Sequence, residues 1–172
     1  LVEATLDQPN LSCDNITRHT MTNSPLTHLT ELLSRYQPSQ SVENAYRTRM
    51  LELARRPHNS LCRSEFKPGH FTASSFVLSP DKQQILLIFH KKLQRWLQPG
   101  GHVEPTDFSI LDAARREVRE EVGISNLSLL GDTQSIFDID IHEIPAHKTE
   151  AAHSHFDIRF AFCAKNKEFQ TN

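Results

Sequence analysis

Two segments near the N-terminus carry apolar residues every three or four positions, which is the spacing of one face of a helix. The first begins with Ser24 and Pro25, a capping residue followed by a residue that favours the first helical position, and Pro38 closes it. The second begins at Ser41 and ends before Pro57. The apolar side consists of Leu26, Leu29, Leu33 and Tyr36 in the first segment and of Val42, Tyr46, Met50, Leu53 and Ala54 in the second. The pattern predicts two amphipathic helices that form a small extension ahead of the main domain.

Short apolar runs separated by turn residues follow this extension. We expect strands at residues 71–78, 84–90, 127–130, 136–142 and 155–163, and a helix at residues 109–122 that Gly123 ends. The run at 84–90 is almost continuously apolar, which predicts a strand buried on both faces. Strands that flank helices in this order predict an α+β protein, an α/β/α sandwich with a mixed β-sheet packed between helices.

Composition and charge limit the class of partner. The net charge of −2 gives no support for bulk nucleic-acid binding, which usually needs a basic stripe, whereas a small anionic ligand needs only local positive charge or a bound cation. The sequence contains no apolar run long enough to span a membrane and no secretory signal, so we expect no membrane association and a cytoplasmic location.

The ends of the chain differ from the centre. Residues 1–20 are polar, show no clear period and precede the first methionine, Met21, so we expect a disordered or non-native tail there. Residues 21–66 then form the helical extension and residues 67–172 the main domain. Because the chain stops soon after an expected core strand, we expect this domain to lack its C-terminal end.

Three carboxylates on one helix carry the strongest chemical signal. Glu117, Glu120 and Glu121 stand at i, i+3 and i+4, so they share one helical face and repel one another by roughly 0.2–0.5 kcal/mol a pair. A divalent cation would remove that cost, and Mg²⁺ prefers carboxylates, waters and substrate phosphates. The opposite face is apolar, formed by Ile110, Leu111, Ala114, Val118 and Val122. Taken alone, the acidic face is more often that of an ordinary charged surface helix.

The helix follows a glycine loop at residues 100–104, and together they resemble a known family. The signature of the Nudix hydrolase family is G-x5-E-x7-R-E-U-x-E-E-x-G-U, in which U is aliphatic. The chain supplies Gly101 and then residues 116–124, with Arg116, the three glutamates, Gly123 and Ile124 in place. The lead-in at residues 96–101 is also similar to that of the family. The resemblance implies a Nudix-type fold for residues 67–172.

The match departs from the signature at two points. Asp107 stands where the family has its first glutamate, and the stretch from Asp107 to Arg116 is one residue longer than the pattern. In the family, that glutamate commonly pairs with the signature arginine. The role of the shorter Asp107 is therefore left open.

The resemblance extends to a largely uncharacterised bacterial subgroup that has a helical N-terminal extension and a PGGHVE loop, here residues 99–104. The similar segments are residues 68–74, 98–104 and 153–159.

As the resemblance implies, we expect a hydrolase that uses Mg²⁺ or Mn²⁺ to cleave a phosphoanhydride in a nucleoside diphosphate linked to another moiety. The three glutamates would hold the metal, and Glu120 or Glu121, or an acid from another loop, would take a proton from water. Arg116 completes the catalytic group by orienting a carboxylate. Gly100, Gly101 and His102 are expected to contact the substrate.

Alternating polar residues mark two later strands. His155, Asp157 and Arg159 share one strand face, and Asp138, Asp140 and His142 repeat the arrangement. These faces either meet solvent or line the cleft, where they could bind a second metal or a phosphate. We expect His155, Asp157 and Arg159 to bind substrate. Trp96 is expected to pack in the core beside the glycine loop, with stacking on a base as the alternative.

Two other functions stay open. A ligand-sensing module could keep the fold and lose turnover, although such relatives usually lose glutamates of the helix. An isoprenyl-diphosphate isomerase usually relies on a reactive cysteine, and Cys13, Cys62 and Cys163 lie beside no recognisable motif. The expected partner is a small nucleotide-type substrate, and a homodimer is an open alternative to a monomer.

Overall fold

A computed structural model of the chain describes residues 24–57, 59–91, 93–131 and 135–166. The expected tail at residues 1–20 lies outside this part. Three helices and seven strands are described: α1 (Pro25–Arg35), α2 (Ser41–Ala54), β1 (Gly69–Leu78), β2 (Ile88–His90), β3 (Arg95–Leu97), β4 (Gly100–His102), α3 (Ile110–Val122), β5 (Leu127–Leu129), β6 (Asp138–Ile144) and β7 (His153–Ala164). The α+β class, the mixed sheet and the helical extension are confirmed.

Helices α1 and α3 begin where their capping serines predict, and α3 ends where Gly123 predicts. The hydroxyl of Ser24 accepts a hydrogen bond from the backbone N–H of Thr27, and that of Ser109 accepts one from Asp112, both at 3.1 Å. Gly123 ends α3 in the left-handed conformation, with φ of 73°, which favours glycine. None of these helices combines the length and apolar composition that crossing a lipid bilayer requires.

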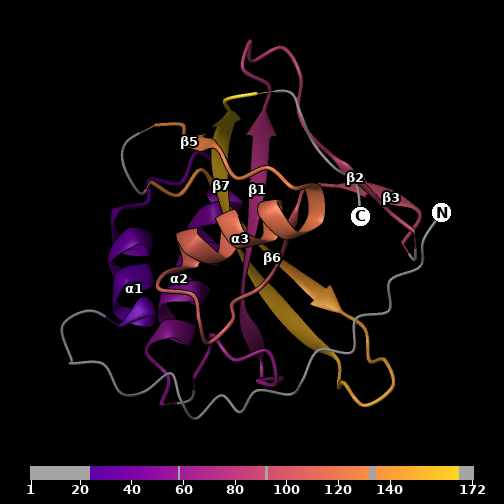
Figure 1. The fold of residues 1–172 in the computed structure, drawn as a ribbon. Helices are drawn as coiled ribbons and strands as arrows, with labels where there is room; N and C mark the ends of the chain where they lie inside the picture. The colour runs from indigo at the N-terminus through magenta and orange to yellow at the C-terminus, as the bar shows by residue number, and fades with distance from the viewer. Residues whose placement is uncertain (1–23, 58, 92, 132–134, 167–172) are drawn as a thin grey trace.

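Strand β7 organises the five-stranded sheet, whose path is β4-β1-β7-β5 with β6 also paired to β7. Its one edge pairs in parallel with β1 from Gly69↔Ser154 to Leu78↔Cys163. Its other edge pairs antiparallel with β6 and then with β5, which follow one another along it. Strand β4 pairs antiparallel with β1, so the glycine segment lies at an edge of the sheet (Figure 1).

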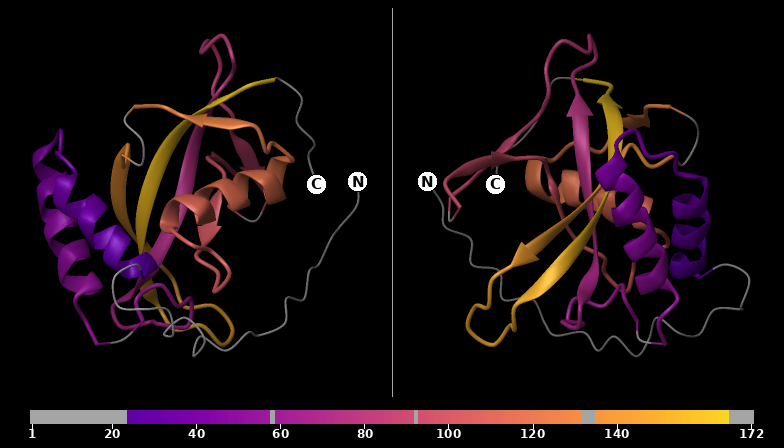
Figure 2. Two further views of the ribbon diagram at one scale, coloured as in Figure 1. Left: turned by 60° about the vertical axis from the view of Figure 1, so that its left-hand side comes forward. Right: turned by 180° about the vertical axis from the view of Figure 1, so that it is seen from behind.

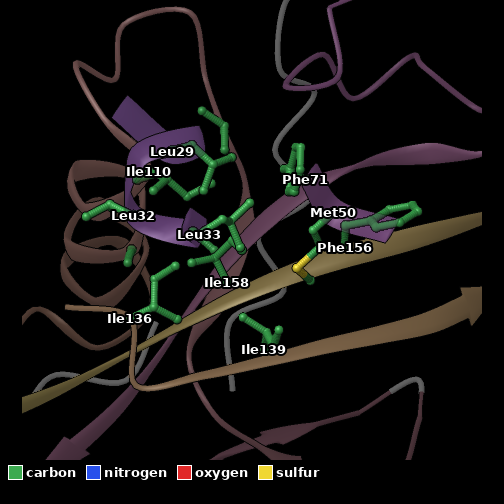
Figure 3. Packing of buried hydrophobic residues seen from close by; sticks show 14 of the residues in the cluster. Leu29, Leu32, Leu33, Met50, Phe71, Ile110, Ile136, Ile139, Phe156 and Ile158 are labelled. Carbon is green, nitrogen blue, oxygen red and sulfur yellow. The ribbon is translucent and has the colours of Figure 1, made fainter. Parts of the chain in front are cut away.

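One apolar cluster joins the helical extension to the sheet and to α3. Figure 3 shows Leu29 and Leu33 of α1 beside Ile110 of α3 and Ile158 of β7, and all four are fully buried. The expected apolar face of α3 is confirmed, since Ile110, Leu111, Ala114, Val118 and Val122 are all buried. Figure 2 shows α1 and α2 side by side, with α3 lying across the strands. Hydrophobic burial therefore fixes the helix that carries the glutamates.

Two expectations about burial were wrong. The run at residues 84–90 forms a strand only at β2, which pairs with β3 in a separate ribbon, and Ile85 and Phe89 are 49% and 39% exposed. An apolar run predicts that a strand is buried, but whether neighbouring elements cover both of its faces depends on the rest of the fold. In α2, Val42 is 46% exposed, whereas Glu43 is buried because it accepts hydrogen bonds from the hydroxyl of Tyr36 and from Ser39.

Candidate active site

Arg116 gathers the acidic side chains of α3. Its Nη1 donates to Glu117 Oε1 and to Glu120 Oε2, each at 2.9 Å, and its Nη2 donates to the backbone carbonyl of His102 at 2.7 Å. The Arg116 and Glu117 side chains are each 14% exposed, whereas that of Glu120 is 50% exposed. The arginine therefore holds two carboxylates against the end of β4, with Glu120 open to solvent.

Asp107 pairs with Arg116, as the family glutamate commonly does. Arg116 donates to it through Nε and Nη2, both at 3.0 Å, in a two-pronged ion pair. Asp107 is buried, and it also accepts from the backbone N–H of Glu104 at 2.8 Å. The shorter side chain thus keeps the arginine contact and closes the turn that precedes α3.

The two glycines of β4 let the glutamates approach the backbone. The N–H of Gly100 donates to Glu121 Oε2 at 3.0 Å. A Cβ on Gly101 would lie 2.7 Å from Glu117 Oε1, closer than atoms of folded proteins approach, and one on Gly100 would lie 2.4 Å from the Cβ of Ser74. Sequence analysis missed that these residues form a strand, because glycine has a low strand propensity and pairing with β1 fixes their conformation.

Burial shifts the titration of two glutamates. Burial, together with the nearby charges of Glu121 and Glu120, raises the pKa of Glu117 to about 7 against the opposing effect of Arg116. Burial also raises the pKa of Glu121. The hydrogen bond from Gly100 opposes this shift, and the charge of Glu120 adds to it. Crowded, partly dehydrated carboxylates of this kind favour a proton or a cation between them.

The polar residues of β7 lie on the other face of the sheet. Ser75 on β1 faces α3, because its hydroxyl donates to the carbonyl of Ala114, whereas Thr72 and Ser74 point to the opposite face and donate to Asp157 at 2.9 and 2.6 Å. Asp157, 4% exposed, also accepts from Nε of Arg159 at 3.0 Å. The structure therefore does not bring Asp157 beside the glutamates, and substrate contact by this face stays a prediction.

Arg159 neutralises the acids of the neighbouring strand. Its two terminal nitrogens donate to Asp138 and Asp140 of β6, each at 2.8 Å. These carboxylates and Asp157 raise the pKa of Arg159 although burial acts in the other direction. The polar residues of these two neighbouring strands thus form one ion-pair network.

Histidines gather where β1, β4 and β7 lie side by side. The ring of His102 lies 5.3 Å from that of His155 and 5.1 Å from that of His70, between ring centroids. His153 lies 5.0 Å from His70 and 5.2 Å from His155. Sequence analysis singled out His102 and His155 but missed His70 and His153. One sequence signal for the cluster was available, because His153 and His155 are two residues apart and therefore share one face of β7.

Trp96 is not a core residue, so the expected packing was wrong. Its side chain is 64% exposed and contacts Phe89 across the β2–β3 ribbon at 5.2 Å between ring centroids. Together with Val77, Leu86 and Ile124 it lines an apolar groove of about 460 Å³. The ribbon stands away from the main sheet, which leaves the tryptophan uncovered (Figure 1).

Comparison with known proteins gives several similar structures. The chain is similar to a Nudix-family hydrolase from Clostridium perfringens, with 27% identity and a TM-score of 0.44 over 60% of this chain and 73% of that one. An Ap4A hydrolase from C. elegans has 20% identity and a TM-score of 0.40, covering 59% and 74% of the two chains. The dihydroneopterin triphosphate pyrophosphohydrolase of E. coli has 17% identity and a TM-score of 0.42, covering 59% and 73%.

A curated relative matches only a short stretch. An uncharacterised 17.7 kDa protein of Enterobacteria phage T4 is 62% identical over 32 residues, which is 19% of this chain and 21% of the phage protein. A family model described as the NUDIX domain matches residues 69–172. This range contains β4, α3 and β7, and therefore the whole glutamate cluster.

Proposed function

The chain belongs to the Nudix family, and we propose that it is a divalent-metal-dependent hydrolase that cleaves a phosphoanhydride bond in a nucleoside diphosphate linked to another moiety. The observation that carries this proposal is the grouping of Glu117, Glu120 and Glu121 beside the glycine strand, where Arg116 and Gly100 hold them. An ordinary charged surface helix would keep its carboxylates in solvent, whereas Glu117 is nearly buried and Glu121 is bound by a backbone N–H.

The donor set suits a hard divalent cation. Glu117, Glu120 and Glu121 offer only oxygen ligands. Burial, and then the charges of the neighbouring glutamates, raise the pKa of Glu117, and a cation that replaces the proton would stabilise the ionised carboxylate. Mg²⁺ or Mn²⁺ held there would neutralise phosphate charge and lower the pKa of a bound water.

The chain's own residues position the reaction. Arg116 is a positioning residue, because its guanidinium is occupied by Asp107, Glu117, Glu120 and the carbonyl of His102. Glu120 or Glu121 takes the proton from the attacking water. Gly100, Gly101 and His102 form the adjacent wall against which we expect the diphosphate to lie.

The test is phosphate release from a panel of nucleoside diphosphate derivatives, measured with Mg²⁺, with Mn²⁺ and with chelator alone. We expect turnover of at least one compound in either metal and none with chelator. Metal-independent turnover would contradict the proposed site. Binding of a nucleotide without turnover in either metal would instead establish a ligand-sensing module.

A further inference from the structure

Five histidines from four strands lie together at one end of the main sheet. They are His70 of β1, His102 of β4, His142 of β6, and His153 and His155 of β7, and neighbouring ring centroids are 4.9–5.5 Å apart. The parallel register places His70 directly opposite His155 although 85 positions separate them in the sequence. The glutamate cluster uses none of these imidazole rings.

Three of the five present their nitrogens to one point. One ring nitrogen each of His70, His153 and His155 lies within 4.8 Å of the others. His70 is 1% exposed and His153 is 4% exposed, so two of the three rings are removed from water. Two nitrogens bound to one tetrahedral Zn²⁺ at about 2.0–2.1 Å lie about 3.4 Å apart, so a pair at the upper limit must close by roughly 1.4 Å.

Backbone carbonyls fix which nitrogen is available. The carbonyl of Glu65 lies 3.0 Å from Nδ1 of His70, and the carbonyl of Ala151 lies 2.7 Å from Nδ1 of His153. Because a carbonyl only accepts hydrogen bonds, Nδ1 of each ring carries the proton and Nε2 keeps its lone pair. A carbonyl behind the ring is the usual support of a metal-bound histidine.

Nε2 of His70 has no hydrogen-bond partner among the described residues although it is fully buried. A buried acceptor without a partner is energetically unfavourable. Neutral imidazole is the form that binds metals.

We propose that His70, His153 and His155 form a second metal site, separate from the glutamate cluster, for a transition-metal cation that prefers imidazole, with Zn²⁺ as the leading ion. Three nitrogen ligands disfavour Mg²⁺, which selects oxygen, and suit Zn²⁺ with a water in the fourth position. His102, at the end of β4, lies beside the site, with its ring next to those of His70 and His155. Because the three ligands come from β1 and β7, the bound ion links these two strands at the end of the sheet.

The test uses the chain without a polyhistidine tag, stripped of metal and titrated with Zn²⁺ and then with Co²⁺. With excess Mg²⁺ present to fill the glutamate cluster, we expect one Zn²⁺ or Co²⁺ ion per chain, a Co²⁺ visible spectrum typical of nitrogen ligands, and a rise in melting temperature with Zn²⁺. His153→Ala and His155→Gln should each weaken binding about tenfold or more. His147→Ala, an exposed histidine on the neighbouring β6–β7 connection, is the matched control and should bind as the wild type does.

A Glu120→Gln/Glu121→Gln double variant separates this site from the proposed catalytic one. It should lose turnover but keep the Co²⁺ spectrum and the stoichiometry. Loss of the spectrum in this variant would overturn the histidine site, as would wild-type affinity in both histidine variants. The wild-type titration tests the site without any substitution, and absence of Zn²⁺ binding at micromolar concentration would also overturn it.

Discussion

Arg116 holds acids from two parts of the chain with one planar guanidinium group. Its Nε and Nη2 bind Asp107, and its Nη1 binds Glu117 and Glu120 of its own helix. Lysine could not replace this arrangement, because its ammonium group is a point charge without the two-pronged geometry. The departure of Asp107 from the family signature is therefore compatible with an intact arginine contact.

A double-mutant cycle tests whether Asp107 and Arg116 act together. Asp107→Ala and Arg116→Ala should destabilise the chain non-additively, with a coupling free energy of about 1–3 kcal/mol, because both side chains are nearly buried. Urea unfolding of the wild type, both single variants and the double variant measures the coupling. Strict additivity would show that the pair contributes nothing as a pair.

Glu117 makes stability depend on pH when metal is absent. Burial raises its pKa from 4.5 to about 7 in the folded chain, so the folded state keeps a proton that the unfolded state has lost. Stability from this group is full below pH 4.5 and is lost as pH rises through 7. Melting temperatures in chelator should fall more steeply over this range for the wild type than for Glu117→Gln, and Mg²⁺ should restore the wild type at pH 8. Parallel profiles for the two proteins would contradict this account.

Strand β4 is the element on which the site is built, and its two glycines serve different neighbours. In Gly101→Ala the new methyl group meets only the movable end of Glu117, so activity should fall at least about tenfold with a stability loss below about 1 kcal/mol. In Gly100→Ala it meets the Cβ of Ser74 and the backbone of Ala73, so stability should fall by about 2–3 kcal/mol. Activity and urea unfolding of both variants measure the contrast. Equal stability losses would contradict the assigned contacts.

The hydrogen bonds around Asp157 predict that its loss destabilises the fold, which the alternation of polar and apolar residues along β7 did not indicate. Because Asp157 is buried and accepts from Thr72, Ser74 and Arg159, Asp157→Ala should cost about 3 kcal/mol. The expectation that Asp157 binds substrate would instead predict a loss of activity with little change in melting temperature. Asp138→Asn, which alters a more exposed partner of Arg159, should cost less than about 1 kcal/mol. Thermal unfolding of both variants decides, and equal shifts would show that the buried network is not coupled as described.

The predictability of each element depends on how local its determinants are. The ends of α1 and α3 follow from Ser24, Ser109 and Gly123, which act within one turn of the helix. The glutamate face of α3 follows from i, i+3 and i+4 spacing. The exposure of β2 and the pairing of β4 depend on which strands lie alongside, and a single sequence does not show this. The histidine cluster depends likewise on the parallel register of β1 with β7.

At the scale of the whole molecule, a buried apolar core stabilises the fold, and the polar site lies at the edge of that core. Leucines of α1, Phe71 of β1, the phenylalanines of β7 and the first turns of α3 form one apolar cluster, and Val118 and Val122 of α3 belong to a second. The outer face of α3 and β4 stay at the border of this core, where the carboxylates meet backbone N–H groups and water. The fold can therefore hold three like charges close together, because burial of the helix's other face stabilises their position.

The central claim is that the glutamates of α3 hold the catalytic metal. Glu121→Gln removes a charge without changing side-chain volume, so the chain should stay folded while turnover in saturating Mg²⁺ falls by at least about a hundredfold. Glu52→Gln, an exposed glutamate of α2, is the matched control and should keep wild-type activity. Turnover is measured on the substrate found in the nucleotide panel, with circular dichroism to confirm folding. A folded Glu121→Gln chain with near-wild-type turnover would contradict the claim.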